Sequence, residues 1–391
     1  MARRKDRTRP SRNAEARRSS TGAARTPTLS ASLPSLVATQ VQENPSAEPE
    51  ALVVSHWFDP GEVGEPYEAT IRLSGRRADV AGRPGPADTF VHEDAIERVV
   101  PGTGPISISS WIYGLKPGVW SVSGELVKAS RVAGRVAVRH AEPVAPAAWS
   151  WRHWSVQTAS PAPIKTRWAL AAPLARIPGV LPGSYTVLFA AGLIVALASQ
   201  LAILASEQIA IPRSIFVSLL ALSAGLLGAK LWSAALHPGE SLLKGGWAVD
   251  GFLVTAPLVA IVALVAFGLP VGAYLDATAP GLFFAIAIGR LGCFLTGCCA
   301  GRVSSSRWAI WSSDRRIGAR RIPAQLLESG AGLLIGTAAL PLTLLHLRAV
   351  HGAVFIVGFA VYFVVRQILL RLREEARRYS WQRSPLVPDH M

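Results

Sequence analysis

The sequence predicts an α-helical polytopic membrane protein of about six transmembrane helices, preceded by a small all-β sandwich-like domain and a disordered basic N-terminus. Half of the 391 residues are hydrophobic, and most of them lie beyond residue 181 in runs close to the roughly 20 residues that a bilayer core requires of a helix. Residues 51–128 instead alternate apolar and polar side chains between Pro/Gly turns, and the first 25 residues are rich in arginine.

Residues 1–48 are rich in Ser, Pro, Ala and Arg, and we expect them to form a disordered basic tail. No apolar core follows the arginines, so the segment does not resemble a signal peptide. The formal net charge of +15 lies in tails and loops instead of on one folded face, and we therefore expect no nucleic-acid partner.

Residues 49–130 are predicted to form a β-sandwich of immunoglobulin or fibronectin type. In "ISISSWIYGLKPGVWSVSGELV", Ile106 and Ile108 alternate with serines, "KPG" supplies a turn, and Trp120, Val122 and Leu126 share one face of the next strand. Further strands are expected at "YEATIRLSGRR" and "DTFVHEDAIERVV". Nothing in this domain indicates catalysis, and its partner is left unknown.

Residues 131–180 are predicted to be a linker that becomes interfacial, because Trp and Arg suit the headgroup region of a bilayer. A transmembrane domain is expected over residues 181–371, followed by a basic C-terminal tail over 372–391. The six apolar runs span residues 185–205, 214–236, 251–268, 281–298, 323–346 and 352–370.

The fourth apolar run carries a permanently charged side chain, Arg290, within "GRLGCFLTGCCAGR". A helix through residues 281–300 would bring Arg290, Cys293 and Gly297 onto one face. Arginine does not deprotonate in proteins, and at mid-bilayer it costs about 2.5–3.5 kcal/mol even on lenient insertion scales. Arg290 therefore requires an anion.

The last apolar run repeats this pattern, since "VYFVVRQILL" places Tyr362 and Arg366 four residues apart on one helix face. Guanidinium groups bind phosphate oxygens bidentately, so two intramembrane arginines indicate a phospholipid headgroup pocket. Asp250 and Glu328 are the alternative, purely structural partners of these arginines.

Several segments resemble the bacterial prolipoprotein diacylglyceryl transferase family, and they occur in the family's order along residues 177–371. "GRLGCFLTGCCAGR" resembles the family signature, and "RIPAQLLES" resembles its Arg-His-Pro-Ser-Gln-Leu-Tyr-Glu segment. "PGSYTVLFAAG" is similar to the first-helix tyrosine segment, "GGWAVDGFL" to the stretch with a His-Gly pair, and "YFVVR" to the family's Tyr-x-x-x-Arg.

The resemblance implies a membrane transferase that moves the diacylglyceryl group of phosphatidylglycerol onto the lipobox cysteine of a prolipoprotein. Arg290 and Arg366 would hold the phosphate as catalytic residues, and Asp250 would be the base. The matched positions that would bind phosphatidylglycerol are Arg290, Arg302, Tyr185, Tyr362, Gln325, Gly297 and Gly301. No cofactor is implied.

The chain departs from the family pattern at several positions. Asp250 replaces the family's histidine, and it is either a base or only an ion-pair partner. Ile322 stands in place of another histidine, and Leu370 replaces an expected carboxylate.

Cys293, Cys298 and Thr296 replace Asn, Glu and Asn of the family signature, and the third cysteine of the chain is Cys299. Their spacing is unlike that of common zinc knuckles, so we expect close helix packing in place of a metal site.

Two alternatives remain open: a related membrane phospholipid transferase with another acceptor, and a non-catalytic protein that binds lipid or metal. The resemblance implies a multi-pass protein of the bacterial plasma (inner) membrane. The positive-inside rule favours a cytoplasmic location for the basic loop over residues 302–321, whereas the family resemblance favours the outer face.

Overall fold

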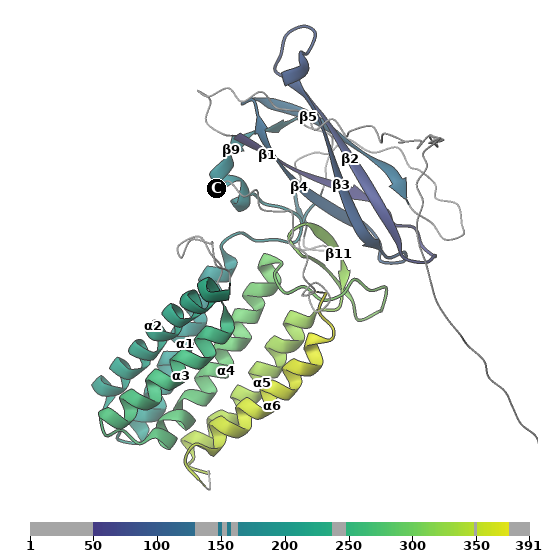
Figure 1. The fold of residues 1–391 in the computed structure, drawn as a ribbon. Coiled ribbons are helices and arrows are strands. Elements are labelled where there is room, and N and C mark those ends of the chain that lie inside the picture. The colour runs from purple at the N-terminus through teal and green to yellow at the C-terminus, as the bar shows by residue number, and fades with distance from the viewer. Residues whose placement is uncertain are drawn as a thin grey trace, which may run out of the picture. The chain divides into compact units, whose positions relative to one another are not determined.

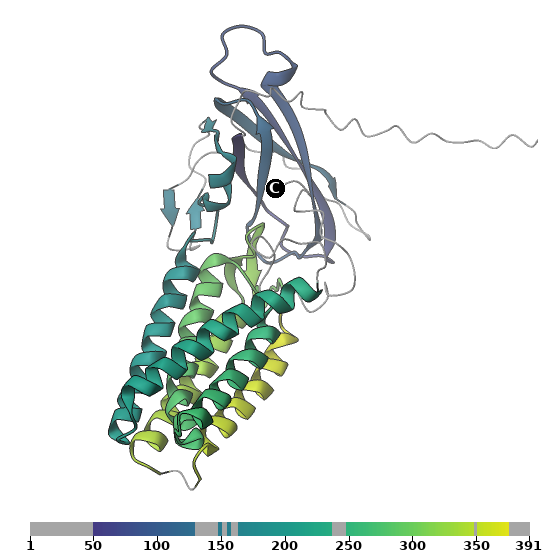
Figure 2. The ribbon, with the colours of Figure 1, turned by 60° about the vertical axis from the view of Figure 1, so that its left-hand side comes forward.

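The computed structural model describes residues 50–129, 148–150, 155–157, 163–236, 248–347 and 350–374. A β-rich region precedes six helices, as Figures 1 and 2 show. The predicted disordered tail over residues 1–48, and residues 375–391 of the predicted C-terminal tail, lie outside the described residues.

The β-rich region contains two larger antiparallel sheets and one two-stranded sheet. One of the larger sheets has the strand order β10-β11-β4-β1-β9, the other has the order β3-β2-β5-β8, and β6 and β7 form the two-stranded sheet. The strands are β1 Glu50–Phe58, β2 Tyr67–Arg77, β3 Thr89–Val99, β4 Ile106–Leu115, β5 Val119–Ala129, β6 Ala148–Ser150, β7 Ser155–Gln157, β8 Ile164–Lys165, β9 Arg167–Trp168, β10 Ile310–Ser313 and β11 Ile317–Arg321. Short 3-10 helices occur at Pro86–Asp88 (η1) and Ala169–Leu174 (η2).

The two sheets enclose one apolar core, to which β1 to β5 and β11 contribute. The predicted strand–turn–strand unit is confirmed, because β4 ends at Leu115 and β5 begins at Val119. Trp120 and Val122 are buried in this core, and Leu126 packs against it. The period-two pattern therefore identified the buried face of β5 correctly.

The loop between the fourth and fifth helices completes one of these sheets. Its strand β11 pairs with β4, where Ile317 lies opposite Ile108 and Gly318 lies opposite Ser107. Arg316 in the same loop donates from Nη2 to Asp94 Oδ1 at 2.8 Å. Burial raises the pKa of Asp94, but hydrogen bonds from His92 and Ser110 and the charge of Arg316 outweigh it and lower this pKa to about 2.

The helices are α1 Ser184–Ser206, α2 Ile211–Leu236, α3 Val249–Ala266, α4 Val271–Thr296, α5 Ala324–Leu344 and α6 Ala353–Leu370. Among the described residues, five of them are long and apolar enough to cross a membrane, and α3 contributes the shorter apolar stretch Val254–Ala266. The predicted fold class of about six membrane helices after a β-rich domain is thereby confirmed. Figures 1 and 2 show the six helices arranged as one bundle.

Small residues allow α4 to approach its neighbours closely. A Cβ at Gly281 would lie 2.5 Å from Ala196 O of α1, and a Cβ at Gly332 of α5 would lie 3.0 Å from Phe283 O of α4. Buried Asp276 of α4 accepts the Gly352 N–H at 2.7 Å and the Phe355 N–H at 3.1 Å, which caps the first turn of α6. Helix α4 thus positions both α1 and α6.

The helix that carries Arg290 differs from the prediction in its bounds. We expected it over residues 281–300, whereas it begins at Val271 after Pro270 and ends at Thr296. Gly297 ends it in the left-handed conformation with φ 71°, and a Cβ there would lie 2.8 Å from Ser313 O. Gly297 therefore does not continue the helical face of Arg290 and Cys293, and the two following cysteines lie in a turn.

Candidate functional site

A buried carboxylate, Glu328 of α5, is the centre of the candidate site. Its side chain is 1% exposed, and four side chains from outside α5 donate hydrogen bonds or ion-pair contacts to it. These are Tyr362 Oη at 2.7 Å, Arg366 Nη1 at 2.6 Å and Arg290 Nη2 at 2.9 Å, all to Oε1, and Arg373 Nη2 at 2.7 Å to Oε2. One acidic residue therefore gathers three arginines.

Local structure explains how these donors converge. Tyr362 and Arg366 lie one turn apart on the same face of α6, as their spacing predicted, and both reach the same carboxylate oxygen of Glu328. Arg373 follows the end of α6, where the chain turns back and pairs with residue Gly301 of the α4–α5 loop. Arg290 reaches Glu328 from α4, its neighbouring helix.

The charges within this cluster do not balance. Among the described side chains, three guanidinium groups surround one carboxylate, which leaves an excess of two positive charges in a part of the protein with little access to water. Arginine has several N–H donors per side chain, and the buried Nε of Arg373 and Nε of Arg302 have no hydrogen-bond partner among the described residues. Since a buried charge without a partner is costly, this surplus favours the binding of an anion.

The signature loop after α4 is held by backbone contacts. Gln325 donates from Nε2 to Cys298 O at 3.0 Å, and Arg302 donates its backbone N–H to Leu372 O at 2.9 Å. A Cβ at Gly301 would lie 1.9 Å from Ile322 O, so only glycine fits where these two segments touch. Among the described contacts, Gln325 and Gly301 therefore shape the loop instead of reaching Glu328.

A second buried arginine, Arg321, ties this loop to the segment after α6. It forms ion pairs with Asp314 at 2.8 Å and with Glu374, and it donates from Nη1 to Gly301 O at 3.1 Å. Arg373 and Glu374 are consecutive, and they pair with Glu328 and Arg321 respectively. This arrangement fixes Arg373 beside the cluster.

The three cysteines gather beside Arg290, whose Nη1 is near two of the sulfur atoms while its Nη2 contacts Glu328. Their Sγ atoms lie within 4.8 Å of one another, and Arg290 Nη1 lies 3.9 Å from the Sγ atoms of Cys293 and Cys299. Cys293 is buried, as expected for a small side chain packed in a helix interface. Cys298 and Cys299 are half-buried, because they lie in the turn after Gly297.

Tyr185 and Asp250, like the predicted residues of the signature loop, do not join the Glu328 cluster among the described contacts. Tyr185 lies in the first turn of α1, stacks on Phe189 with ring centroids 6.2 Å apart, and is 43% exposed. A Cβ added at Gly292 would lie 3.2 Å from the Cα of Tyr185, so Tyr185 lies against α4 one residue before Cys293. Asp250 belongs to the first turn of α3, and its side chain lies outside the described residues.

Sequence reasoning missed one arginine of the cluster and underestimated Glu328. Glu328 was considered only as a structural partner, and it proves to pair with both predicted arginines. The basic tail predicted over residues 372–391 includes Arg373, although Arg373 follows Tyr362 and Arg366 at 11 and 7 residues, a spacing that keeps a helical face. That spacing was the available signal.

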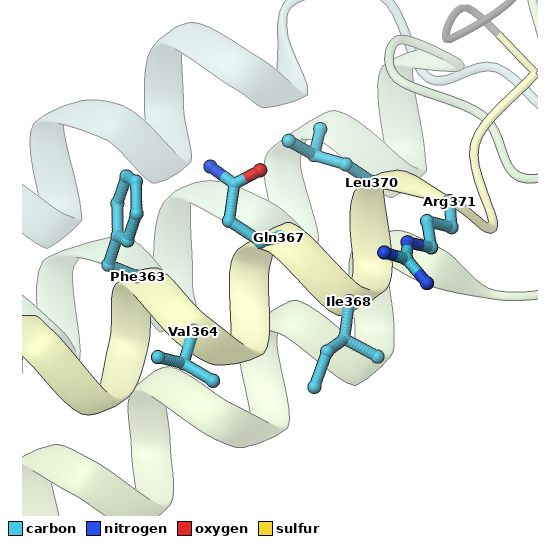
Figure 3. Close-up of a pocket in the computed structure, with 6 residues that line it drawn as sticks. All are labelled: Phe363, Val364, Gln367, Ile368, Leu370 and Arg371. Carbon is cyan, nitrogen blue, oxygen red and sulfur yellow. The ribbon is translucent and has the colours of Figure 1, made fainter.

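A shallow groove of ≈ 440 Å³ lies on a different face of α6. Figure 3 shows its lining residues, which are Phe363, Val364, Gln367, Ile368, Leu370 and Arg371. The lining is apolar apart from Gln367 and Arg371, and neither Tyr362 nor Arg366 contributes to it. We therefore place the candidate site at the Glu328 cluster, where the charged groups converge.

Comparison with known proteins agrees with the sequence resemblance. No curated protein matches the chain. The family model described as prolipoprotein diacylglyceryl transferase matches residues 174–386, which is more than half of the chain and includes all six helices. The matched range contains the Glu328 cluster and the three cysteines. This membrane-spanning chain therefore belongs to the prolipoprotein diacylglyceryl transferase family, with an additional β-rich region before the matched residues.

Proposed function

We propose that this chain transfers the diacylglyceryl group of phosphatidylglycerol to the lipobox cysteine thiol of a prolipoprotein. The observation that carries the proposal is the excess of two positive charges where Arg290, Arg366 and Arg373 surround Glu328. A phosphodiester headgroup carries a single negative charge and accepts bidentate hydrogen bonds from guanidinium groups. It is therefore a suitable ligand for N–H donors that Glu328 does not occupy.

The proposed reaction uses these donors on the leaving group. The acceptor thiolate attacks the glycerol carbon that bears the phosphate, a C–S bond forms, and the C–O bond breaks with its electron pair going to glycerol phosphate. Negative charge grows on the departing oxygen, and Arg290 and Arg366 stabilise it because they are already oriented by Glu328. Hydrogen-bond donors stabilise such a charge most effectively when they are already oriented and when water is largely excluded from the site.

A base is also required, because an unperturbed thiol has a pKa of about 8.5. We propose Asp250 for this role, since it stands at the family's histidine position. A structural role as an ion-pair partner remains the alternative for Asp250. Tyr185, Tyr362, Arg302, Gln325, Gly297 and Gly301 complete the proposed site, the first three as lining residues and the last three as supports of the signature loop.

The test is rescue of a bacterial strain depleted of its own diacylglyceryl transferase, read as the mass of a lipoprotein. The wild-type chain should restore the thioether-linked diacylglyceryl mass. Arg290→Ala and Arg366→Ala should each lower the rate by about 10²–10³-fold. Arg371→Ala is the matched control, because this arginine lies on the outward groove of α6 and should leave the rate unchanged.

The same strain decides the role of Asp250. As a base, Asp250→Asn and Asp250→Ala should both abolish transfer in protein that is present at wild-type levels in the membrane. Transfer retained in Asp250→Asn would reject Asp250 as the base. A wild-type chain that is inserted in the membrane and restores no lipoprotein would contradict the proposed acceptor.

A related transferase with another acceptor is the second candidate, favoured by Ile322 and Leu370 at positions where the family has His and a carboxylate. Purified protein with labelled phosphatidylglycerol distinguishes the two. Release of glycerol phosphate only in the presence of a lipobox peptide supports prolipoprotein as the acceptor. Release without modification of the peptide supports the second candidate.

We further propose that the protein resides in the bacterial plasma membrane, with residues 181–371 as the transferase domain and residues 49–130 as an accessory domain that contacts an unidentified partner. Protease accessibility of the loop over residues 302–321 in intact and permeabilised cells tests its orientation. Cleavage in intact cells supports the outer face, whereas cleavage only after permeabilisation supports the positive-inside rule.

A further inference from the structure

The three cysteines of the chain form one cluster that the proposed transfer leaves unused. They are the only cysteines in the sequence, and their Sγ atoms lie within 4.8 Å of one another. We propose that Cys293, Cys298 and Cys299 bind one Zn²⁺ ion and leave its fourth coordination position open to a thiolate from outside the cluster.

The end of α4 creates this cluster. Gly297 in the left-handed conformation stops the helix, and the backbone N–H of Cys298 returns to Cys293 O at 3.0 Å. Cys299 also has a positive φ, 55°, which non-glycine residues rarely adopt. Two left-handed residues within three positions fold the chain back, so thiols five and six residues along the chain meet Cys293. The spacing of the three cysteines in the sequence does not by itself predict that their thiols converge.

The distances suit a thiophilic ion after a small adjustment. Tetrahedral zinc has Zn–S bonds of about 2.3 Å, which places bound sulfur atoms about 3.8 Å apart. The three Sγ atoms already lie within 4.8 Å, so each pair needs to approach by about 1 Å or less. Cys298 and Cys299 lie in the turn after the helix, so we expect rotation of their side chains to make this adjustment without movement of α4.

The surrounding charges also suit a zinc–thiolate group. Three thiolates and one Zn²⁺ ion carry a single net negative charge, and Arg290 Nη1 lies 3.9 Å from two of the sulfur atoms. N–H groups directed at bound sulfur commonly support metal sites of this kind. Loading the ion would reduce the positive excess around Glu328 from two charges to one, which equals the charge of a phosphodiester.

Three protein ligands with an open fourth position are typical of catalytic zinc, whereas structural sites are closed by four. Arg290 contacts both the sulfur cluster and Glu328. The side chain of Arg290 therefore connects the proposed zinc ion, with its open coordination position, to the proposed phosphate pocket. If the proposed function holds, the fourth ligand is the acceptor thiol, and the proton that it loses on binding the ion passes to the proposed base, Asp250. Zinc would then favour the deprotonated form of the acceptor thiol, in a chain that has Asp250 and Ile322 where the family has histidines.

The first experiment measures metal in the full chain, purified in detergent after growth with zinc. We expect about one zinc per chain, and background levels in Cys293→Ser, Cys298→Ser and Cys299→Ser. Thr343→Ser, a conservative change at the distant end of α5, should retain the metal. Co²⁺ replacement should produce a thiolate-to-metal charge-transfer band in the wild-type protein, and this readout does not depend on the folding of any variant.

The result that overturns the metal site is a wild-type chain without stoichiometric zinc and without the Co²⁺ band. A count of one free thiol per chain before reduction and three afterwards would show a disulfide instead, and would also reject the proposal.

The acceptor is tested on the Co²⁺-loaded protein with a lipobox peptide and its Cys→Ser variant. A fourth thiolate should raise the charge-transfer intensity by about one third with the cysteine peptide only. An unchanged spectrum would reject the acceptor as a ligand and retain the metal site. Because neither assay requires turnover, failure here is distinct from failure of the proposed transferase activity.

Discussion

Neutralising Glu328 should destabilise the protein more than any surface ion pair can. In Glu328→Gln, the side chain keeps one acceptor oxygen, while its new NH₂ group faces donors from the arginines that formerly shared the carboxylate. Four donors currently converge on this group, and hydrogen bonds to charged groups contribute about 1.5–3 kcal/mol each before desolvation is subtracted. Removal of one partner from a buried ion pair costs about 3–5 kcal/mol, and we expect that range.

The matched control is Glu93→Gln, which makes the same chemical change in an exposed pair. Arg72 and Glu93 lie 2.7 Å apart, with side chains 38% and 42% exposed, so water and salt screen their attraction. Exposed pairs contribute about 0–1 kcal/mol, and the control should unfold close to the wild type.

Thermal unfolding of both variants in the same detergent measures the difference. For a chain with a cooperative unit of this size, about 3–5 kcal/mol corresponds to a fall of about 10 °C in Tm. A fall no larger than that of Glu93→Gln would refute the description of Glu328 as the buried counterion of three arginines. Arg373→Gln added to Glu328→Gln should recover part of the loss, because it removes one unpaired charge.

Three further predictions follow from particular contacts. Asp276→Ala should lower stability by about 1–3 kcal/mol in detergent melts because two N–H groups at the start of α6 lose their acceptor, while Asp276→Asn should retain part of it. Gly301→Ala should be misfolded or inactive, since its Cβ would lie 1.9 Å from Ile322 O, whereas Gly289→Ala, with nothing within 4 Å, should keep wild-type expression and lipoprotein modification. Burial lowers the pKa of His56 from 6.5 to about 4, so on acidification His56 is protonated in the unfolded chain before it is protonated in the folded chain. The free energy of unfolding should therefore fall by about 3 kcal/mol as the pH decreases from 6.5 to about 4. Denaturant titrations at several pH values should show this slope in the wild type and a weaker one in His56→Gln; equal slopes would exclude His56 as its source.

The sequence alone determined the features that depend on local periodicity. Apolar runs of bilayer length located the six helices, and alternation with a Pro-Gly turn located β4 and β5. The four-residue interval between Tyr362 and Arg366 placed both on one face, and their shared contact with Glu328 agrees with it. These patterns are readable because each residue's environment follows from neighbours within one or two turns.

Tertiary structure decided the features that join distant segments. Glu328 could have faced lipid, α4 or α6, and only helix packing selected the three arginines as its partners. The sulfur cluster required the helix to end at Thr296, four residues before the predicted end. Likewise, β11 joins a sheet whose next strand, β4, lies about 200 residues earlier in the chain. Local propensity carries no information about such pairings, because their free energy comes from burial and charge compensation that exist only in the folded protein.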